Sequence, residues 1–351
     1  MAASINDDAS LAGGAITVPP ARRGRRISGG YLLRRVLLAI ESFLVTLVIG
    51  FIVFSLVPSD PAQALSRAQA VTAQQMADLR KDLGLDQPII VRFFRFLGNT
   101  FTGNFGYSWE FRQSVGGLIA SAIGPTLLLM GCATLISVLL GLWLGVRSGW
   151  KPGSKFDRFF TGTAVTLWSV PTFWLGMMLL VVFSVGVGPL PRIFPAGGMS
   201  DPTVDPSGIA HILDVAHHLV LPCLTLVAVT FAQNLMIMRS SLVDELGNAY
   251  LTTARAKGLR DSEVRRRHAV PNAMLPAITV IFLQIGGLVG GAIVTETVFS
   301  WPGLGLLVYN GIKIPDLPLL EGTFVIFSGS VIVFNLLADL LYRVLDPRVK
   351  G

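Results

Sequence analysis

Long apolar runs recur along this 351-residue chain and restrict its fold more than any other feature. Each run holds about 20 residues, enough for a helix to cross the hydrocarbon core of a bilayer. A helix satisfies its own backbone hydrogen bonds inside the membrane, where water cannot do so. The sequence therefore predicts an all-α polytopic membrane protein with six transmembrane helices. These spans are expected at 34–57, 125–146, 159–185, 218–238, 273–294 and 323–342.

The distribution of charge supports this class of protein and gives the chain an orientation. Only 14% of the residues are charged, against about 25% in soluble proteins. Of the 28 Lys and Arg residues, 20 fall within 1–35, 147–158, 239–267 and 343–350. Because basic residues accumulate in cytoplasmic loops, these stretches are expected on the inner side of the cell membrane, with both termini cytoplasmic. The net charge of +7 is explained without any nucleic-acid partner.

The segments outside the spans divide the chain further. Residues 1–33 indicate a disordered basic cytoplasmic tail. A twin-arginine or secretory signal is the rival, but the apolar run that follows exceeds the ~7–15 residues of a signal core. Residues 58–124 are expected to form an outward-facing region, extracellular or periplasmic, that is too short for an enzyme domain. Residues 125–351 hold the other five spans and an inward-facing loop at 239–272.

The motifs of common active sites are absent from the sequence. It contains no phosphate-binding loop, no HExxH and no G-x-S-x-G elbow. Cys132 and Cys223 lie far apart within apolar runs and are expected to pack rather than to bind metal. His211, His217 and His218 could bind a metal, but a position at the membrane interface is the simpler interpretation. We therefore predict no catalytic, cofactor-binding or metal-binding residue in this chain.

A polar, basic insert at 244–276 stands out from the apolar remainder. Its composition predicts two short helices broken at Gly258, a position suited to a helix end with positive φ. Asp244 and Glu245 are expected in the first turn, where the helix dipole favours negative charge. Asp261 is expected to cap the second helix.

Two interpretations of this insert stay open from the residues alone. Its first half is rich in Ala and Thr, which would leave a shallow surface for a partner protein. The alternative is an amphipathic helix on the inner leaflet, held there by Arg265, Arg266 and Arg267.

Glycines make one face of the fifth span nearly free of side chains. Such a face permits close packing of helices, and it could also form a narrow wall along a pathway. The candidate pathway-lining residues are Gln284, Gly287, Gly290 and Gly291, and Gly286 extends the same face.

Several motifs together resemble one family. The insert holds YLTTARAKGL at 250–259 and ends in LP at 275–276, which resembles the EAA loop of ABC importer permeases. The further matches are LGLDQP at 83–88, GNFGYS at 103–108, SVPTFWLG at 169–176, ETVFSWPGLG at 296–305 and DPR at 346–348. From residue 33 onward the chain looks like a B-type permease subunit of the dipeptide/oligopeptide transport family. Thr252 stands where the EAA motif begins with Glu, and Pro271 where a flexible or basic residue is more frequent.

This resemblance implies a type I ABC importer permease fold and a set of partners. These are a second, C-type permease, two ATP-binding domains (separate or fused) that hold ATP and Mg²⁺, a substrate-binding protein outside, and the lipid bilayer. The implied ATPase-coupling residues are Glu245, Ala249, Tyr250, Thr252, Thr253, Ala254, Arg255, Ala256, Lys257, Gly258 and Leu259. The predicted outer gate or docking residues are Glu296, Trp301, Pro302, Gly303 and Gly305.

The resemblance implies inward transport of di- or oligopeptides, with nickel complexes, glutathione and other peptide-sized solutes as alternatives. A secondary transporter is the main rival, but it needs charges within its spans for ion coupling. The spans offer only Glu41, within reach of Arg34 and Arg35, and Asp339. A membrane-embedded enzyme or a purely structural subunit are further rivals, and the first lacks a convergent polar site.

Overall fold

The computed structural model describes residues 29–56, 74, 87–187, 192–205, 208–288 and 293–345. Within these ranges every named element is helical, and the one pairing of extended backbone is an isolated bridge between Tyr107 and Ser114. The all-α prediction is confirmed. Most of the predicted basic tail and much of the outward-facing region lie outside the described residues.

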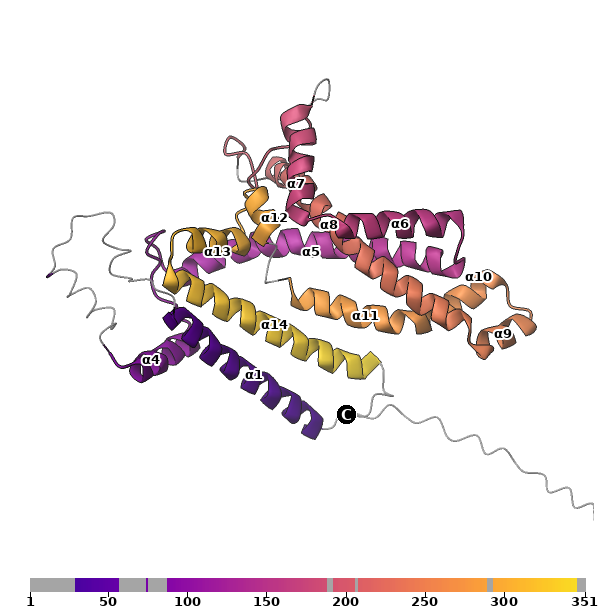
Figure 1. Cartoon of the computed structure of the whole chain (residues 1–351), viewed down its shortest axis with the longest axis horizontal. Helices are drawn as coiled ribbons and strands as arrows, with labels where there is room; N and C mark the ends of the chain where they lie inside the picture. The colour runs from indigo at the N-terminus through magenta and orange to yellow at the C-terminus, as the bar shows by residue number, and fades with distance from the viewer. Residues whose placement is uncertain are drawn as a thin grey trace, which may run out of the picture.

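Long helices run side by side along the long axis of the molecule (Figure 1). Four of them are α1 (Gly29–Leu56), α5 (Val115–Trp150), α8 (Ile209–Leu246) and α14 (Leu317–Leu345). A fifth, α11 (Val270–Gly286), continues from the two short elements before it, so that Asp261–Ile285 forms one run of 25 residues. These five are long and apolar enough to cross a membrane, and a bent pair of helices makes up to six.

The third span is broken rather than continuous as predicted. It consists of α6 (Lys155–Ser169), α7 (Thr172–Leu180) and the π-helical η1 (Val181–Gly186), with a bend of 97° between α6 and α7. Val170 adopts an extended conformation because the ring of Pro171 disfavours the helical one for the residue before it. In Figure 1, α7 therefore stands out from the bundle in which α6 lies.

Other spans differ in length from the prediction. Helix α5 begins at Val115, where Ser114 caps it by accepting a hydrogen bond from the backbone N–H of Gly117 at 3.3 Å, and it contains Pro125. Helix α8 begins at Ile209. Helix α11 ends at Gly286 instead of continuing to 294, because glycine costs about 1 kcal/mol per residue in a helix.

A row of glycines brings α5 against α8. Gly141, Gly145 and Gly149 recur every four residues on the contacting face of α5. A Cβ atom on Gly141 would lie 2.5 Å from the Cβ of Asn234, and one on Gly145 would lie 2.7 Å from the Cβ of Met238. Small residues at this spacing let two backbones approach closely. The α5–α8 pair is therefore the most tightly packed part of the core.

Helix α1 lies on the opposite side of the bundle, packed against α14 (Figure 1). The guanidinium of Arg35 donates to the carboxylate of Asp339 at 2.6 Å. Arg35 thus pairs with the last helix and not with Glu41. Asp339, one of the two acids that could have coupled transport to an ion, is neutralised by this pair.

Short helices close the end of the bundle at which α1 finishes and α14 begins. They are α4 (Ile89–Thr102), α12 (Ile293–Val298) and α13 (Leu304–Lys313). The buried carboxylate of Asp316 holds this end together, since it accepts from the hydroxyl of Ser108 at 2.5 Å and from the N–H groups of Glu110 and Leu319. The loop before α5 is thereby fastened to the start of α14.

Candidate coupling segment and gate loop

The polar insert forms a compact segment at the end of the molecule opposite α4 (Figure 1). It consists of α9 (Ala249–Ala256), α10 (Asp261–Glu263) and η2 (Val264–Ala269), which we call the coupling segment. Gly258 has a φ of +82°, and its N–H donates to the carbonyl of Arg255 at 2.9 Å. The predicted break at Gly258 is confirmed.

Two details of the insert were predicted wrongly. Asp244 and Glu245 lie in the last turn of α8, not the first turn of α9, because α8 runs on past both residues. Asp261 does not cap the second helix, because Arg260 occupies the cap position without a side-chain hydrogen bond. The carboxylate of Asp261 instead accepts from Arg255 at 3.2 Å. This pair crosses the turn and holds α9 near α10.

One face of α9 anchors the coupling segment to the bundle. Leu251 and Ala254 are buried in a cluster with Leu242, Val264 and Ala269. The opposite face carries most of the residues predicted to couple to an ATPase, with Glu245 and Leu259 partly buried at its ends. The exposed ones are Ala249, Tyr250, Thr252, Thr253, Arg255, Ala256, Lys257 and Gly258.

Tyr250 joins three helices at the base of this segment. Its hydroxyl donates to the carboxylate of Glu245 on α8 and accepts from the side-chain amide of Asn272 on α11 at 2.9 Å. Burial, together with the carboxylate of Glu245, raises the pKa of Tyr250 above its usual value. Tyr250 therefore links α9 to both α8 and α11 through hydrogen bonds.

The second half of the segment continues directly into a span. Asp261–Ile285 is a single helical run, in which η2 has the wider turns of a π-helix, a feature frequent at functional sites. Pro271 lies within this run, at the second residue of α11, and has no backbone N–H to donate to the turn before it. Helix α10 continues through η2 into α11 without an intervening loop.

A buried ion pair forms a second link near this end. The guanidinium of Arg239 on α8 contacts the two carboxylate oxygens of Asp157 on α6 at 2.6 and 2.8 Å. The Asp157 side chain is 3% exposed, and it also accepts from the N–H of Gly153 and the hydroxyl of Thr161. The sequence analysis missed this pair. The one available signal was an acid within the basic stretch 147–158.

At the other end, residues 296–305 form a turn between α12 and α13 that we call the gate loop. The side chain of Glu296 is fully buried and accepts from the hydroxyl of Thr126 at 2.8 Å. It also accepts from the N–H groups of Gly305 at 2.7 Å and Leu306 at 3.2 Å. The Thr126 hydroxyl in turn accepts from the N–H of Leu304 at 2.7 Å. Burial raises the pKa of Glu296, and these hydrogen bonds oppose that rise.

The gate loop is fastened where α5 contains a proline. Fully buried Trp301 donates its indole N–H to the carbonyl of Pro125 at 2.9 Å. Only glycine fits at Gly303 and Gly305, where a Cβ atom would lie 2.4 Å from the Glu296 carboxylate and 2.6 Å from a backbone carbon. Of the five predicted gate residues Pro302 alone is exposed. The gate or docking role stays a prediction, and any docking contact would involve the surface around Pro302.

Polar side chains meet between α8 and α11. The amide of Gln284 accepts from Asn234 and donates to Gln233, both at 3.3 Å. Gln233 is exposed and Gln284 partly so, which gives this part of two spans a polar surface. Gln284 was a predicted pathway residue, whereas Gln233 was missed although it stands as a polar residue in an apolar run. Gly287 ends α11. Gly290 and Gly291 lie outside the described residues.

Two of the three histidines near the start of α8, His217 and His218, form polar contacts with the chain around them, whereas Nδ1 of His211 is buried without a hydrogen-bond partner. A ring nitrogen of His217 lies 2.8 Å from the carbonyl oxygen of Ile193, and His218 lies 3.3 Å from the carboxylate of Asp214. Among the described residues, no group of three metal-ligating side chains is brought together. These contacts fit the interface position predicted for His217 and His218.

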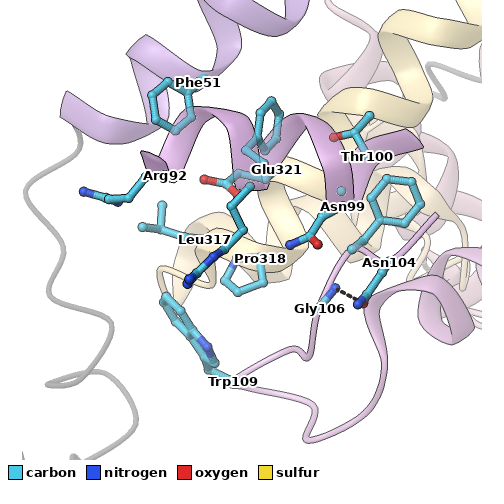
Figure 2. Close-up of a pocket in the computed structure, with 14 residues that line it drawn as sticks. Phe51, Arg92, Asn99, Thr100, Asn104, Gly106, Trp109, Leu317, Pro318 and Glu321 are labelled. Carbon is cyan, nitrogen blue, oxygen red and sulfur yellow. Dashed lines mark hydrogen bonds between the residues drawn. The ribbon is translucent and has the colours of Figure 1, made fainter. Parts of the chain in front are cut away.

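A cavity of ≈ 240 Å³ lies where α1 ends and α14 begins, next to α4 (Figure 2). Arg92 and Arg95 of α4 and Glu321 of α14 line it together with Phe51 and Trp109. The sequence analysis missed Glu321, which stands just before the predicted last span. The cavity lies far from the coupling segment, at the opposite end of the molecule.

Several helices long and apolar enough to cross a membrane, with a polar segment at one end, define a polytopic membrane protein. Two family models match this chain. Residues 137–351 match the family described as "Binding-protein-dependent transport system inner membrane component". Residues 30–129 match the N-terminal region of such membrane components. The chain belongs to this family and is a permease subunit of an ABC importer.

Relatives and a solved structure agree with this assignment. The chain is 40% identical over 322 residues to a putative peptide permease protein of Brucella suis. It is 37% identical over 320 residues to the glutathione permease protein GsiC of Salmonella typhimurium, and 34% over 336 residues to the dipeptide permease protein DppB of Escherichia coli K12. Each match covers 91% of this chain and 98% of the relative. The inward-facing MetNI methionine ABC transporter shares the fold, with a TM-score of 0.50 at 18% identity, over 65% of this chain and 96% of that one.

Proposed function

We propose that this chain is the B-type permease of an importer that moves di- or oligopeptides, or peptide-like solutes such as glutathione, into the cell. Similarity along 91% of the chain to permeases named for peptide, dipeptide and glutathione transport carries the proposal. The polar patch of Gln233 and Gln284 supports it, because amide groups can pair with the peptide groups of a cargo.

The exposed face of α9 is the surface proposed to receive work from an ATP-binding domain. Its small side chains leave room for a close contact, and Gly258 gives the sharp turn at its edge. Movement of α9 and α10 would pass into α11 through the continuous helix and into α8 through Tyr250 and Glu245. ATP and Mg²⁺ are assigned to two partner ATP-binding domains, because this chain has no phosphate-binding loop.

The coupling segment is proposed to face the cytoplasm. The basic stretches 147–158 and 239–267 lie together at its end of the molecule, and α1 begins at the same end (Figure 1). By the positive-inside rule, this arrangement supports cytoplasmic termini and a gate loop on the outer side. A substrate-binding protein would dock at the outer end.

Helix α7 is the surface proposed to meet the second, C-type permease. Its bend of 97° carries it away from the bundle, and Phe173, Trp174, Met177 and Met178 stay exposed. Apolar side chains at such a protruding site need either lipid or a protein partner. A partner permease with a complementary bend would bury them.

Transport by the reconstituted complex tests this proposal. The permease pair and the ATP-binding domains are placed in liposomes with the binding protein and a labelled dipeptide outside. We expect uptake that requires ATP inside and is competed by dipeptides or by glutathione, which identifies the cargo. Uptake that is driven by an ion gradient without ATP would show a secondary transporter instead. ATP-dependent uptake of a solute unrelated to peptides would overturn the cargo while retaining the importer.

A further inference from the structure

A cavity of ≈ 960 Å³ lies beside the coupling segment, between the end of α5, the start of α6 and η2. Four cationic side chains line it, namely Arg147 in the last turn of α5, Lys151 directly after α5, and Arg265 and Arg266 from η2. The one acidic side chain in its wall, Glu263, already has Arg267 at 3.8 Å. None of the other ion pairs found among the described residues involves any of these four cations. The cavity therefore has a strong excess of positive charge, which attracts an anion.

Aromatic rings lie against two of these four cations, Arg147 and Arg265. The guanidinium of Arg147 lies 4.8 Å from the ring centroid of Phe156 and 5.8 Å from that of Trp143. The guanidinium of Arg265 lies 5.9 Å from the ring of Trp150. Stacking on aromatic faces fixes a cation without neutralising it. The cavity is thus preorganised for negative charge.

The same cavity adjoins a surface suited to hydrocarbon. Leu135, Leu139 and Trp143 follow one another every fourth residue along α5 and are 60%, 61% and 56% exposed. Arg147 continues this row at the cavity. One line along the helix thus passes from aliphatic to aromatic to cationic side chains, the order in which a phospholipid presents acyl chain, interface and headgroup.

We propose that this cavity binds the headgroup of an anionic phospholipid, with the acyl chains lying along the Leu135–Leu139 row. The phosphate would be held by Arg147 and Lys151 on one side and by Arg265 and Arg266 on the other. The lipid therefore bridges the α5–α6 connection and the coupling segment. The binding of this lipid does not depend on the proposed transport function.

Native mass spectrometry of the purified full chain with added phosphatidylglycerol tests the binding. Removing a cation at such a site weakens binding by about fivefold. We therefore expect the double variant Arg147→Gln/Arg265→Gln to bind about 25-fold more weakly. Arg158→Gln is the matched control, since this exposed cation of the same region does not line the cavity. Equal retention of phosphatidylglycerol by the wild type and the double variant would overturn the proposal, as would equal affinity for phosphatidylethanolamine.

Further measurements exclude misfolding of the variants and other occupants of the cavity. Arg147→Lys/Arg265→Lys keeps the charge, so it should bind within a few-fold of the wild type and shows that loss in the Gln variant is not misfolding. Inorganic phosphate at millimolar concentration should not displace the lipid; full displacement would show a site for a soluble anion. If the Gln variant instead loses the ATP-binding domains on purification and retains lipid, the cavity is a protein contact and the proposal is wrong. Because these binding arms need neither cargo nor ATP, their failure is distinguishable from failure of the importer assignment.

Discussion

The gate loop and the coupling segment carry sequence motifs of similar length. The fold buries most motif residues of the gate loop and exposes most of those in the coupling segment. In the gate loop, Glu296 and Trp301 are fully buried and their polar atoms are hydrogen-bonded. In the coupling segment, the motif residues face outward and Leu251 and Ala254 alone are buried within α9. A motif can therefore mark residues that the fold buries or residues that it leaves exposed.

This contrast has an energetic consequence. Leaving a buried donor without its acceptor costs about 1–3 kcal/mol for each group, whereas exposed substitutions change stability by less than about 0.5 kcal/mol. Substitutions in the gate loop should therefore reduce folding first. Substitutions on the exposed face of α9 should reduce ATP-coupled transport while the chain stays folded.

The largest effect is expected for Glu296→Ala. This substitution leaves the N–H groups of Gly305 and Leu306 and the hydroxyl of Thr126 without their acceptor in a buried site. Each buried donor left without an acceptor costs about 1–3 kcal/mol, so we expect a loss of about 3–5 kcal/mol in the free energy of unfolding. Thermal unfolding of the purified chain in detergent measures it. Glu296→Gln retains one acceptor oxygen and should lose less. If the Ala and Gln variants were both as stable as the wild type, the hydrogen bonds of Glu296 would not stabilise the gate loop.

A smaller loss of stability is expected when the ion pair between Asp157 and Arg239 is broken. Hydrogen bonds to charged groups contribute about 1.5–3 kcal/mol, and Arg239 is 27% exposed, so solvent screens part of this. Asp157→Asn should therefore destabilise the chain by about 1.5–3 kcal/mol. A double-mutant cycle with Arg239→Gln isolates the pair. Strictly additive losses would show that the two side chains do not interact.

Gly258→Val should separate stability from coupling. The φ of +82° costs a residue with a Cβ atom about 1–2 kcal/mol, but no atom lies within 4 Å of the added Cβ, so no clash accompanies the strain. We expect modest destabilisation and at least tenfold lower cargo-stimulated ATP turnover in the assembled complex. Gly258→Asn is the control, because Asn tolerates this conformation. Normal turnover and transport in an assembled Val variant would contradict the coupling role.

The sequence predicted those features that depend on neighbouring residues. The apolar runs predicted the long helices, and the position of Gly258 predicted the break in the insert. Pairings across the fold were missed, as for Arg35 with Asp339, which are 304 positions apart. The bend at Pro171 was missed for a different reason. A proline within a span can be accommodated by neighbouring helices, and local sequence does not say whether they do so.

The glycine row of α5 was visible in the sequence but was passed over for the glycines of the fifth span. Gly141, Gly145 and Gly149 have the four-residue spacing of close helix packing, and α8 lies against them. Gly286 and Gly287 instead end α11. Spacing predicts that a face is smooth, but the partner that covers it follows from tertiary structure.

The smallest effect on stability, and the sharpest test of the comparison, is expected for Ala256→Trp. Ala256 is exposed on α9, so the substitution should change the free energy of unfolding by less than about 0.5 kcal/mol. If α9 seats in a cleft of an ATP-binding domain, the indole fills the space that the small residues leave, and ATP-driven uptake should fall at least tenfold. If α9 lies on the inner leaflet instead, a tryptophan suits the membrane interface and uptake should be unchanged. Ala256→Ser, measured in the same uptake and unfolding assays, should behave as the wild type in either case, so the size of the side chain alone decides between the two surfaces.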